Sequence, residues 1–361
     1  MSRIYNFNAG PAALPLEVLQ TAQAELIDFN GTGMSILESS HRAKAYAAIH
    51  QEAKDNIREL MGVPENYSIL FLQGGASTQF SMVPMNLLTE GKVADYTNSG
   101  TWANKAIKEA KKVGKVNIVA DCQKEIPTRV PSMDELKLTP DAAYLHITTN
   151  ETISGAQWKE IPNVACPIVA DMSSDILSRP IDVSKFGLIY AGAQKNLGPS
   201  GLTVVIIRND LAEAAPENLP TMLQYRTHIA EDSLYNTPPC YGIYICGKVF
   251  KWIKKMGGLE AMKKLNEEKA AVLYDYLDSQ DYYIAPVKKD SRSMMNVTFV
   301  TGDADLDKKF CAEAAKAGLV NLKGHRSVGG MRASIYNAMP YEGVEKLVAF
   351  MKEFAKNNPK M

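Results

Sequence analysis

The chain has 361 residues, of which 46% are hydrophobic, so a large core is available. Lysine plus arginine and aspartate plus glutamate both number 40, so the formal net charge is zero, and nothing favours nucleic acid or a membrane surface as the main partner. No run approaches 18 uninterrupted apolar residues, and the first residues contain no long apolar stretch typical of a secretory signal.

In the first two thirds of the chain, helical patterns alternate with short apolar runs. Helices are predicted over 16–29, 43–61 and 101–113, where apolar residues recur with the helical period. Several of the short runs are apolar throughout, as expected for strands covered on both faces. The predicted strands are 67–73, 92–98, 116–121, 142–148, 166–171, 188–193 and 202–208.

This alternation predicts an α/β fold with a mainly parallel sheet and helices on both of its faces. One strand is expected to be antiparallel, because the segment LGPSG at 197–201 is short enough to join two neighbouring strands as a hairpin.

A second region begins near KKMGG at 254–258, where paired glycines suit a helix end. We therefore predict a large domain over 16–258 and a smaller α+β domain made of 1–15 and 259–361. The elements predicted in this region are helices at about 259–280, 304–317 and 341–357 and strands at 294–300 and 331–337.

The five cysteines are scattered without CxxC spacing. An odd, unpatterned set is typical of a reducing cytoplasm, and it fits neither a disulfide framework nor a zinc site. We therefore expect a cytoplasmic protein without a metal centre. The cysteines are Cys122, Cys166, Cys240, Cys246 and Cys311.

The segment LFLQGGASTQF at 70–80 takes a predicted strand into small residues and then into a helical pattern. Backbone N–H groups at such a turn can approach an anion, and a helix N-terminus favours a negative ligand. Ser77 or Thr78 would equally serve as a simple helix cap. With that alternative left open, the small residues before the helix make this segment a candidate phosphate-binding site.

Asp171 and Trp102 stand beside predicted strands, where ligands bind in α/β sheets. Asp171 directly follows an apolar run, and its alternative is a turn aspartate that bonds its own backbone. Trp102 begins a predicted helix; it could provide a flat stacking surface or be an ordinary core aromatic.

Two histidines of this chain directly precede an arginine, at His41-Arg42 and His325-Arg326, and Arg332 follows paired glycines. Arginine supplies a rigid fork of donors for carboxylates and phosphates, and histidine adds a further donor. Either pair alone is better explained by solvated surface side chains. The two pairs together with Arg332 make an anion-binding role a hypothesis worth testing.

Lys195 stands at the mouth of a predicted buried strand, in AGAQKNLGPSG, although lysine is rarely buried without a partner. Its position alone favours a side chain that reaches solvent. Together with a phosphate-binding site, a stacking tryptophan and the carboxylate of Asp171, however, it matches what pyridoxal 5′-phosphate requires. Lysine forms the Schiff base, and aspartate keeps the pyridine nitrogen protonated.

Along nearly its whole length the chain resembles the phosphoserine aminotransferase family. The resemblance implies a pyridoxal phosphate enzyme of the aspartate-aminotransferase fold type, with a large cofactor domain and a small domain. It also implies a homodimer with active sites at the interface. The motifs that carry it are NFNAGPAALP (6–15), GMSILESSHR, LQGGAS, NSGTWANKA, NETISG, VADMSSD, AGAQKNLGPSG, YNTPP and HRSVGGMRAS.

The resemblance also implies individual roles. Lys195 would carry the cofactor and shuttle a proton, Asp171 would pair with the pyridine nitrogen, and Trp102 would stack on the ring. The remaining positions are Thr152 for the ring hydroxyl; Ala76, Ser77 and Gln194 for the cofactor phosphate; Asn236 and Thr237 for the same phosphate from the other subunit; Arg332 for the substrate α-carboxylate; and His41, Arg42, His325 and Arg326 for the distal phosphate or the glutamate side-chain carboxylate.

The implied reaction transfers the amino group of L-glutamate to 3-phosphohydroxypyruvate and gives 2-oxoglutarate and O-phospho-L-serine, a step of serine biosynthesis. In many bacteria the family also forms 4-phosphohydroxy-L-threonine on the route to pyridoxine. The alternative is another pyridoxal phosphate enzyme of this fold, an alanine–glyoxylate type aminotransferase or a cysteine desulfurase. A non-catalytic phosphate- or nucleotide-binding protein would explain QGGAST but would leave Lys195 and Asp171 without a reason.

Overall fold

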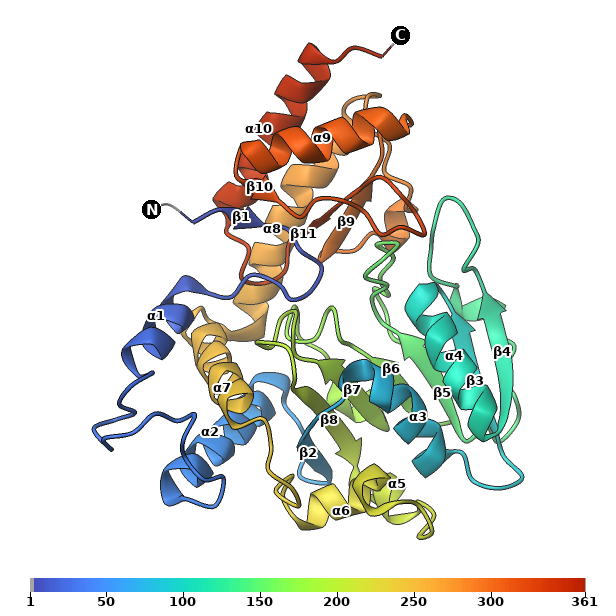
Figure 1. Ribbon diagram of the computed structural model, residues 1–361. Helices are drawn as coiled ribbons and strands as arrows, with labels where there is room; N and C mark the ends of the chain where they lie inside the picture. The colour runs from blue at the N-terminus through green and yellow to red at the C-terminus, as the bar shows by residue number, and fades with distance from the viewer. Residues whose placement is uncertain (1–2, 361) are drawn as a thin grey trace.

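A twisted seven-stranded sheet forms the centre of the larger part of the molecule, seen in this computed structural model, which describes residues 3–360 (Figure 1). Its strands are β2 (Tyr67–Leu72), β3 (Val93–Asn98), β4 (Lys115–Asp121), β5 (Tyr144–Thr148), β6 (Ile168–Asp171), β7 (Leu188–Gly192) and β8 (Thr203–Arg208). The order across the sheet is β2-β8-β7-β6-β5-β3-β4. β8 is antiparallel to both neighbours, and the pairs from β7 to β4 are parallel. The predicted fold class is confirmed.

Helices cover both faces of this sheet because its strands carry apolar side chains on both sides. Ile69 and Phe71 of β2 belong to a core shared with two long helices, whereas Leu70 and Leu72 of the same strand face the other two. The helices on the first face are α2 (Lys44–Met61) and α7 (Cys240–Lys255), and those on the second are α3 (Gly75–Leu87) and α4 (Thr101–Val113). The remaining helices of this part are α1 (Leu16–Ala24), α5 (Asn209–Glu213) and α6 (Tyr225–Ala230).

The smaller part gathers the end of the chain and its first residues around a separate apolar core (Figure 1). Its elements are α8 (Gly258–Asp278), β9 (Asn296–Phe299), α9 (Ala304–Lys316), β10 (Leu319–Val320), β11 (Met331–Ser334), α10 (Tyr341–Asn357) and β1 (Tyr5–Asn6). β9 pairs antiparallel with β11, and β1 pairs parallel with β10. These contacts are consistent with the division at 16–258, which stays a prediction.

Several boundaries differ from the predicted ones. The helix expected over 16–29 ends at Ala24, and an irregular segment runs to Ala43 with Asn30, Gly31 and Gly33 at positive φ, which a helix cannot accommodate. The strand expected over 331–337 ends at Ser334. The glycines of KKMGG predicted the helix end that α7 shows at Lys255, but the extent of α7 was not predicted. Among residues 3–360, no helix is long and apolar enough to cross a bilayer.

Candidate active site

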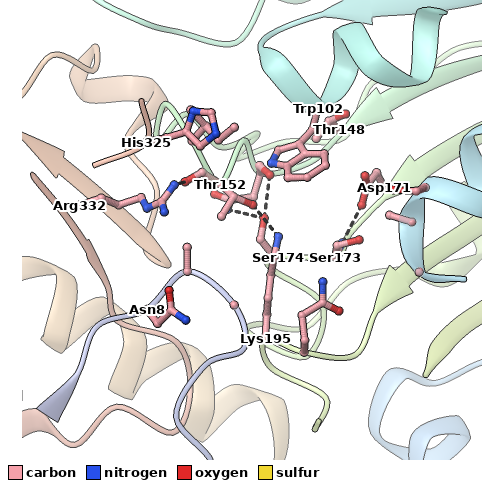
Figure 2. A pocket seen from close by; sticks show the side chains of 18 residues that line it. Asn8, Trp102, Thr148, Thr152, Asp171, Ser173, Ser174, Lys195, His325 and Arg332 are labelled. Atoms are coloured by element: carbon pink, nitrogen blue, oxygen red, sulfur yellow. Dashed lines mark hydrogen bonds between the residues drawn. The ribbon is translucent and has the colours of Figure 1, made fainter. Parts of the chain in front are cut away.

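A cavity of about 330 Å³ lies at the carboxyl ends of β5 and β6, where the loops of the sheet meet the smaller part. Figure 2 shows Trp102 above Lys195, with Asp171 on one side and His325 and Arg332 on the other. Nine of the predicted site residues line this one cavity. They are Ala76, Ser77, Trp102, Thr152, Asp171, Gln194, Lys195, His325 and Arg332.

Lys195 is buried in the turn that follows β7, which explains a lysine at a strand end. The backbone closes this turn by bonds from Ala193 N to Leu202 O (2.9 Å) and from Gly198 N to Ala193 O (2.8 Å). The side chain points into the cavity, where Nζ donates to Thr152 Oγ1 at 2.7 Å. Burial lowers the pKa of the Lys195 amine to about 8, although Asp171 opposes the shift. A fraction of this amine is therefore a free nucleophile near neutral pH.

Asp171 ends β6, next to Thr148 of β5 and Tyr190 of β7 in the register of the sheet. Ser173 N donates to its Oδ1 at 2.9 Å. Burial raises the pKa of this carboxyl, while Ser173 and Lys195 act in the opposite direction. Thr148 Oγ1 is buried in the same wall without a hydrogen-bond partner. Both groups fit a polar, cationic ligand in the cavity better than an apolar one.

The first turns of α3 and α4 enter the cavity from the side of the sheet. Gly75, Ala76 and Ser77 begin α3, and Gly74 before them caps it with φ 93 and no side-chain hydrogen bond, so the first N–H groups are free for an anion. Trp102 lies in the first turn of α4, with Lys195 Nζ 5.9 Å from its ring centroid. The arrangement fits a flat, phosphorylated cofactor.

Arg332 and His325 come from the smaller part and line the opposite wall, where Arg332 supplies positive charge. Arg332 on β11 donates from Nη1 to Thr152 O at 3.1 Å. His325 Nδ1 lies 2.7 Å from Ser327 Oγ, and burial together with Arg332, Arg326 and Lys105 lowers the pKa of its imidazole. The positive charges of Arg332, Arg326 and Lys105 around this histidine favour an anionic substrate.

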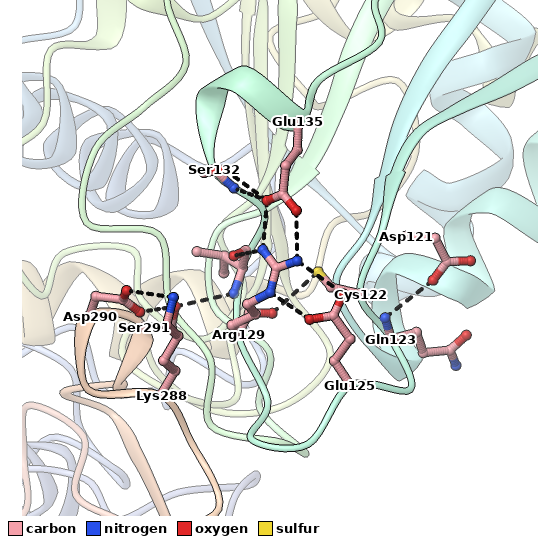
Figure 3. Close-up of polar contacts among 11 residues, drawn as sticks. Asp121, Cys122, Gln123, Glu125, Arg129, Ser132, Glu135, Lys288, Asp290 and Ser291 are labelled. Carbon is pink, nitrogen blue, oxygen red and sulfur yellow. Dashed lines mark hydrogen bonds and ion pairs between the residues drawn. The ribbon is translucent and has the colours of Figure 1, made fainter.

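Polar contacts join the segment around Arg129 to Ser291 of the smaller part (Figure 3). Gln157 N donates to Ser291 O (2.8 Å), and Ser291 Oγ accepts from Val130 N (3.3 Å). Beside it, Arg129 donates to both carboxylate oxygens of Glu135 (2.6 and 2.7 Å) and to Glu125. The segment after Thr152 is therefore tied to the smaller part through Gln157 and Ser291.

Five predicted site residues do not line this cavity. Asn236 and Thr237 lie in the segment between α6 and α7, where Gln73 Nε2 donates to Thr237 O at 3.3 Å. His41 and Arg42 lie in the irregular segment before α2, and Arg326 is exposed beyond His325. Within residues 3–360 of one chain, nothing brings these five side chains to the cofactor cavity.

Other cavity residues were not singled out as site residues from the sequence. Four of them are polar residues inside motifs that carry the resemblance, such as NETISG and VADMSSD. Their signal was available, because polar residues at the carboxyl ends of adjacent parallel strands meet at one sheet edge. They are Asn8, Ala9, Gly10, Gly75, Thr148, Asn150, Ile153, Ser173 and Ser174.

Comparison with known proteins agrees with this geometry. The family model described as aminotransferase class-V matches residues 4–347. A phosphoserine aminotransferase of Geobacillus kaustophilus is 58% identical over 357 residues, which cover 99% of each chain. The chain belongs to the phosphoserine aminotransferase family. The resemblance predicted from its motifs is confirmed.

Solved structures of this family share the whole fold. A phosphoserine aminotransferase from Bacillus circulans subsp. alkalophilus superposes with a TM-score of 0.95 at 53% identity, covering 98% of this chain and 99% of that one. The PLP-bound phosphoserine aminotransferase from Trichomonas vaginalis gives a TM-score of 0.94 at 45% identity, covering 97% of this chain and 100% of that one.

Proposed function

We propose that this family member is a pyridoxal phosphate-dependent transaminase that moves the amino group of L-glutamate to 3-phosphohydroxypyruvate, giving O-phospho-L-serine and 2-oxoglutarate. The observation that carries the proposal is the buried amine of Lys195, 2.7 Å from Thr152 in a cavity that Asp171 also lines. Relatives named phosphoserine aminotransferase that match the full length support the choice of substrate.

The residues of the cavity fit the cofactor. Pyridoxal phosphate, when bound, supplies an aldehyde for amine exchange and a ring that withdraws electrons from the substrate Cα. Lys195 would hold it covalently and then accept and return a proton at the substrate carbon, for which a pKa of about 8 suits its amine. Asp171 would keep the pyridine nitrogen charged, because ion pairing is strong at a buried site.

Three further groups would orient the cofactor. Trp102 would stack on the ring and exclude water from one face. Thr152 would bond the ring hydroxyl, and the first N–H groups of α3, with Ser77 and Gln194, would bind the phosphate. We propose that Asn236 and Thr237 reach the same phosphate from a second subunit, since they lie outside the cavity of their own chain.

The cationic wall would select the substrate. A phosphomonoester carries about −1.5 to −2 charge and three acceptor oxygens at neutral pH. Arg332 would bind the α-carboxylate. We propose that the distal phosphate, or the side-chain carboxylate of glutamate, binds the two His-Arg pairs, of which His325 already lines the cavity.

We further propose that the enzyme is a cytoplasmic homodimer with shared active sites and that it acts in serine biosynthesis, with 4-phosphohydroxy-L-threonine on the pyridoxine route as a possible second product. Free thiols at all five cysteines, which lie within the described residues, support a reducing compartment.

An absorbance scan and a substrate panel test the function. The purified protein should show a visible band that borohydride removes, and peptide mapping should place the reduced pyridoxyl group on Lys195. Glutamate plus 3-phosphohydroxypyruvate should turn over much faster than alanine plus glyoxylate, and cysteine should release no sulfide. A colourless protein that binds phosphate would favour the non-catalytic alternative.

A further inference from the structure

One buried carboxylate next to the cavity has no part in the chemistry described above. Glu151 follows β5, between Asn150 and Thr152, and its side chain has no exposed surface. A buried carboxylate is costly unless it receives hydrogen bonds, so its partners reveal what it stabilises.

Those partners are the backbone of the first turn of α4. Glu151 Oε2 accepts from Trp102 N at 3.2 Å, and Oε1 accepts from Ala103 N at 3.0 Å. The residue before the helix, Gly100, offers no side-chain cap. A carboxylate 48 residues away in sequence therefore does what an Asp or Ser normally does at this position, and its charge suits the helix dipole.

Gly100 leaves the space that the carboxylate fills. A Cβ built on Gly100 would lie 2.5 Å from Glu151 Cδ and 2.6 Å from Oε2. The φ of Gly100 is 173°, an extended conformation open to any residue, so the backbone does not demand glycine. The absence of a side chain there is explained by the close approach of Glu151.

The indole of Trp102 makes few polar contacts of its own. Its Nε1 is buried without a hydrogen-bond partner, and Lys105 Nζ lies over the ring at 4.1 Å from the centroid. The ring plane consequently depends on packing and on where the backbone of the first turn stands, and Glu151 bonds that backbone directly.

We propose that Glu151 is a positioning residue for the cofactor: its carboxylate fixes the first turn of α4 and thereby the plane of Trp102 against which the pyridoxal ring stacks. This inference rests on the proposed function and extends it to a residue outside the cavity. The NETISG motif would then have two roles: Glu151 positions α4, and Thr152 bonds Lys195.

The charge of Glu151 changes near neutral pH. Burial raises the pKa of its carboxyl to about 7; the two N–H donors and Lys195 lower it, and Asp171 raises it. Ser99 Oγ, at 3.5 Å from Oε1, also faces the carboxylate. Protonation as the pH falls below 7 turns one acceptor oxygen into a hydroxyl, so the cap of α4 should loosen on acidification.

A double-mutant cycle on the cofactor-loaded protein tests the inference. Glu151→Gln keeps the shape but places an amide N–H against a backbone N–H. We expect about a tenfold rise in the dissociation constant of pyridoxal phosphate and an altered visible circular dichroism band, which reports the ring's surroundings. In a Trp102→Ala background the same change should raise the dissociation constant by less than about twofold, because the side chain through which Glu151 acts is absent.

A matched control separates positioning from loss of a helix cap. Asp303 caps α9 in the same way, with Oδ1 accepting from Asp305 N (2.8 Å) and Leu306 N (3.1 Å), and it does not line the cavity. Asp303→Asn should lower the melting temperature as Glu151→Gln does and leave the dichroism band and cofactor affinity unchanged.

Two results would overturn the inference. One is an equal loss of cofactor affinity from Glu151→Gln with and without Trp102, and the other is an unchanged dichroism band in the single variant. If Glu151→Gln does not fold, near-ultraviolet dichroism of the wild type and of Trp102→Phe is measured across a range of pH. The difference between the two spectra, which reports Trp102, should change with a midpoint near pH 7. A difference that does not change with pH would reject the inference. Failure of the proposed function would look different, since the wild type would then bind no pyridoxal phosphate.

Discussion

The pKa of the Lys195 amine reports the combined effect of burial and of the charges around it. Burial lowers the pKa of its amine to about 8, against about 10.4 for a free lysine; Arg332 adds to the shift, and Asp171 opposes it. A lowered pKa means that the amine loses its proton at lower pH. Reductive methylation of Lys195 in cofactor-free protein should therefore rise through a midpoint near pH 8.

Mass spectrometry of the digested protein would follow this labelling, with the exposed Lys264 in the same digest as reference. Asp171→Asn removes the group that stabilises the ammonium form most, so it should move the Lys195 midpoint to lower pH. A Lys195 that labels in parallel with Lys264 at every pH would contradict the buried, activated amine.

The three arginines predicted to bind substrate should differ in which substrates their removal affects. A charge-assisted hydrogen bond is worth about 1.5–3 kcal/mol, so removing one should cost about ten- to a hundredfold in kcat/KM. Arg332→Ala should reduce kcat/KM for every amino acid substrate, since all carry an α-carboxylate. Arg326→Ala and Arg42→Ala should reduce it for phosphoserine and glutamate while leaving the visible spectrum of the cofactor nearly unchanged.

Steady-state kinetics with phosphoserine, glutamate and serine measure this separation. A site built for the phosphate rejects serine because the cations then remain unpaired. Wild-type turnover of serine at a rate similar to phosphoserine would show that the two His-Arg pairs have another role.

At the scale of single residues, a site residue could be predicted from the sequence when it stood at the end of a predicted strand. Asp171 and Lys195 were predictable because each stands at the end of an apolar run, where ligands meet the sheet. Glu151 was not, since its partners belong to a helix 48 residues earlier, and a carboxylate after a strand looks like any loop residue. The predicted role of Asn236 came only from family resemblance, because the phosphate that we propose it binds would lie in a second subunit.

At the scale of elements, periodicity predicted the sheet well because buried parallel strands are apolar throughout. It did not delimit α7, whose residues Ile243 to Gly247 are buried in succession and hide the period of the first turns, although lysines recur at helical spacing from Lys248 to Lys255. The two-residue strands β1 and β10 were also out of reach, since their pairing joins opposite ends of the chain.

The turn between β2 and α3 depends on one glycine. Gly74 has φ 93, and a Cβ there would lie 2.0 Å from Thr78 Oγ1. Gly74→Ala should cost about 1–2 kcal/mol of unfolding free energy for the left-handed conformation alone, with more for the clash, and it should weaken pyridoxal phosphate binding by distorting this phosphate-binding site.

Gly91→Ala is the matched control for this turn. Gly91 also has a left-handed conformation, with φ 80, but nothing lies within 4 Å of its added Cβ. Urea unfolding should show a smaller loss for Gly91→Ala, and equilibrium dialysis should show unchanged cofactor affinity. If both variants lost the same stability and the same cofactor affinity, the turn at Gly74 would have no special role in binding the cofactor.

At the scale of the whole molecule, the two segments that carry predicted site residues outside the cavity expose large apolar side chains. The irregular segment before His41 and Arg42 exposes Ile27 at 81% and Leu37 at 61% of their surface, and Tyr235 beside Asn236 is 47% exposed. In the proposed homodimer, a second copy of the chain would cover these side chains and bring the four predicted site residues of these segments to a neighbouring cavity.

Mixing two defective variants tests whether the active sites are shared. Lys195→Ala should be inactive, and the double variant Asn236→Ala, Thr237→Ala should be nearly inactive at limiting pyridoxal phosphate. If those residues act across the interface, a mixed dimer holds one intact site: the lysine of one subunit with the phosphate ligands of the other. Random reassociation makes half of the dimers mixed, so activity should return to about one quarter of the wild type. If Asn236 and Thr237 serve their own subunit, every site in the mixture carries a defect, and no activity is regained.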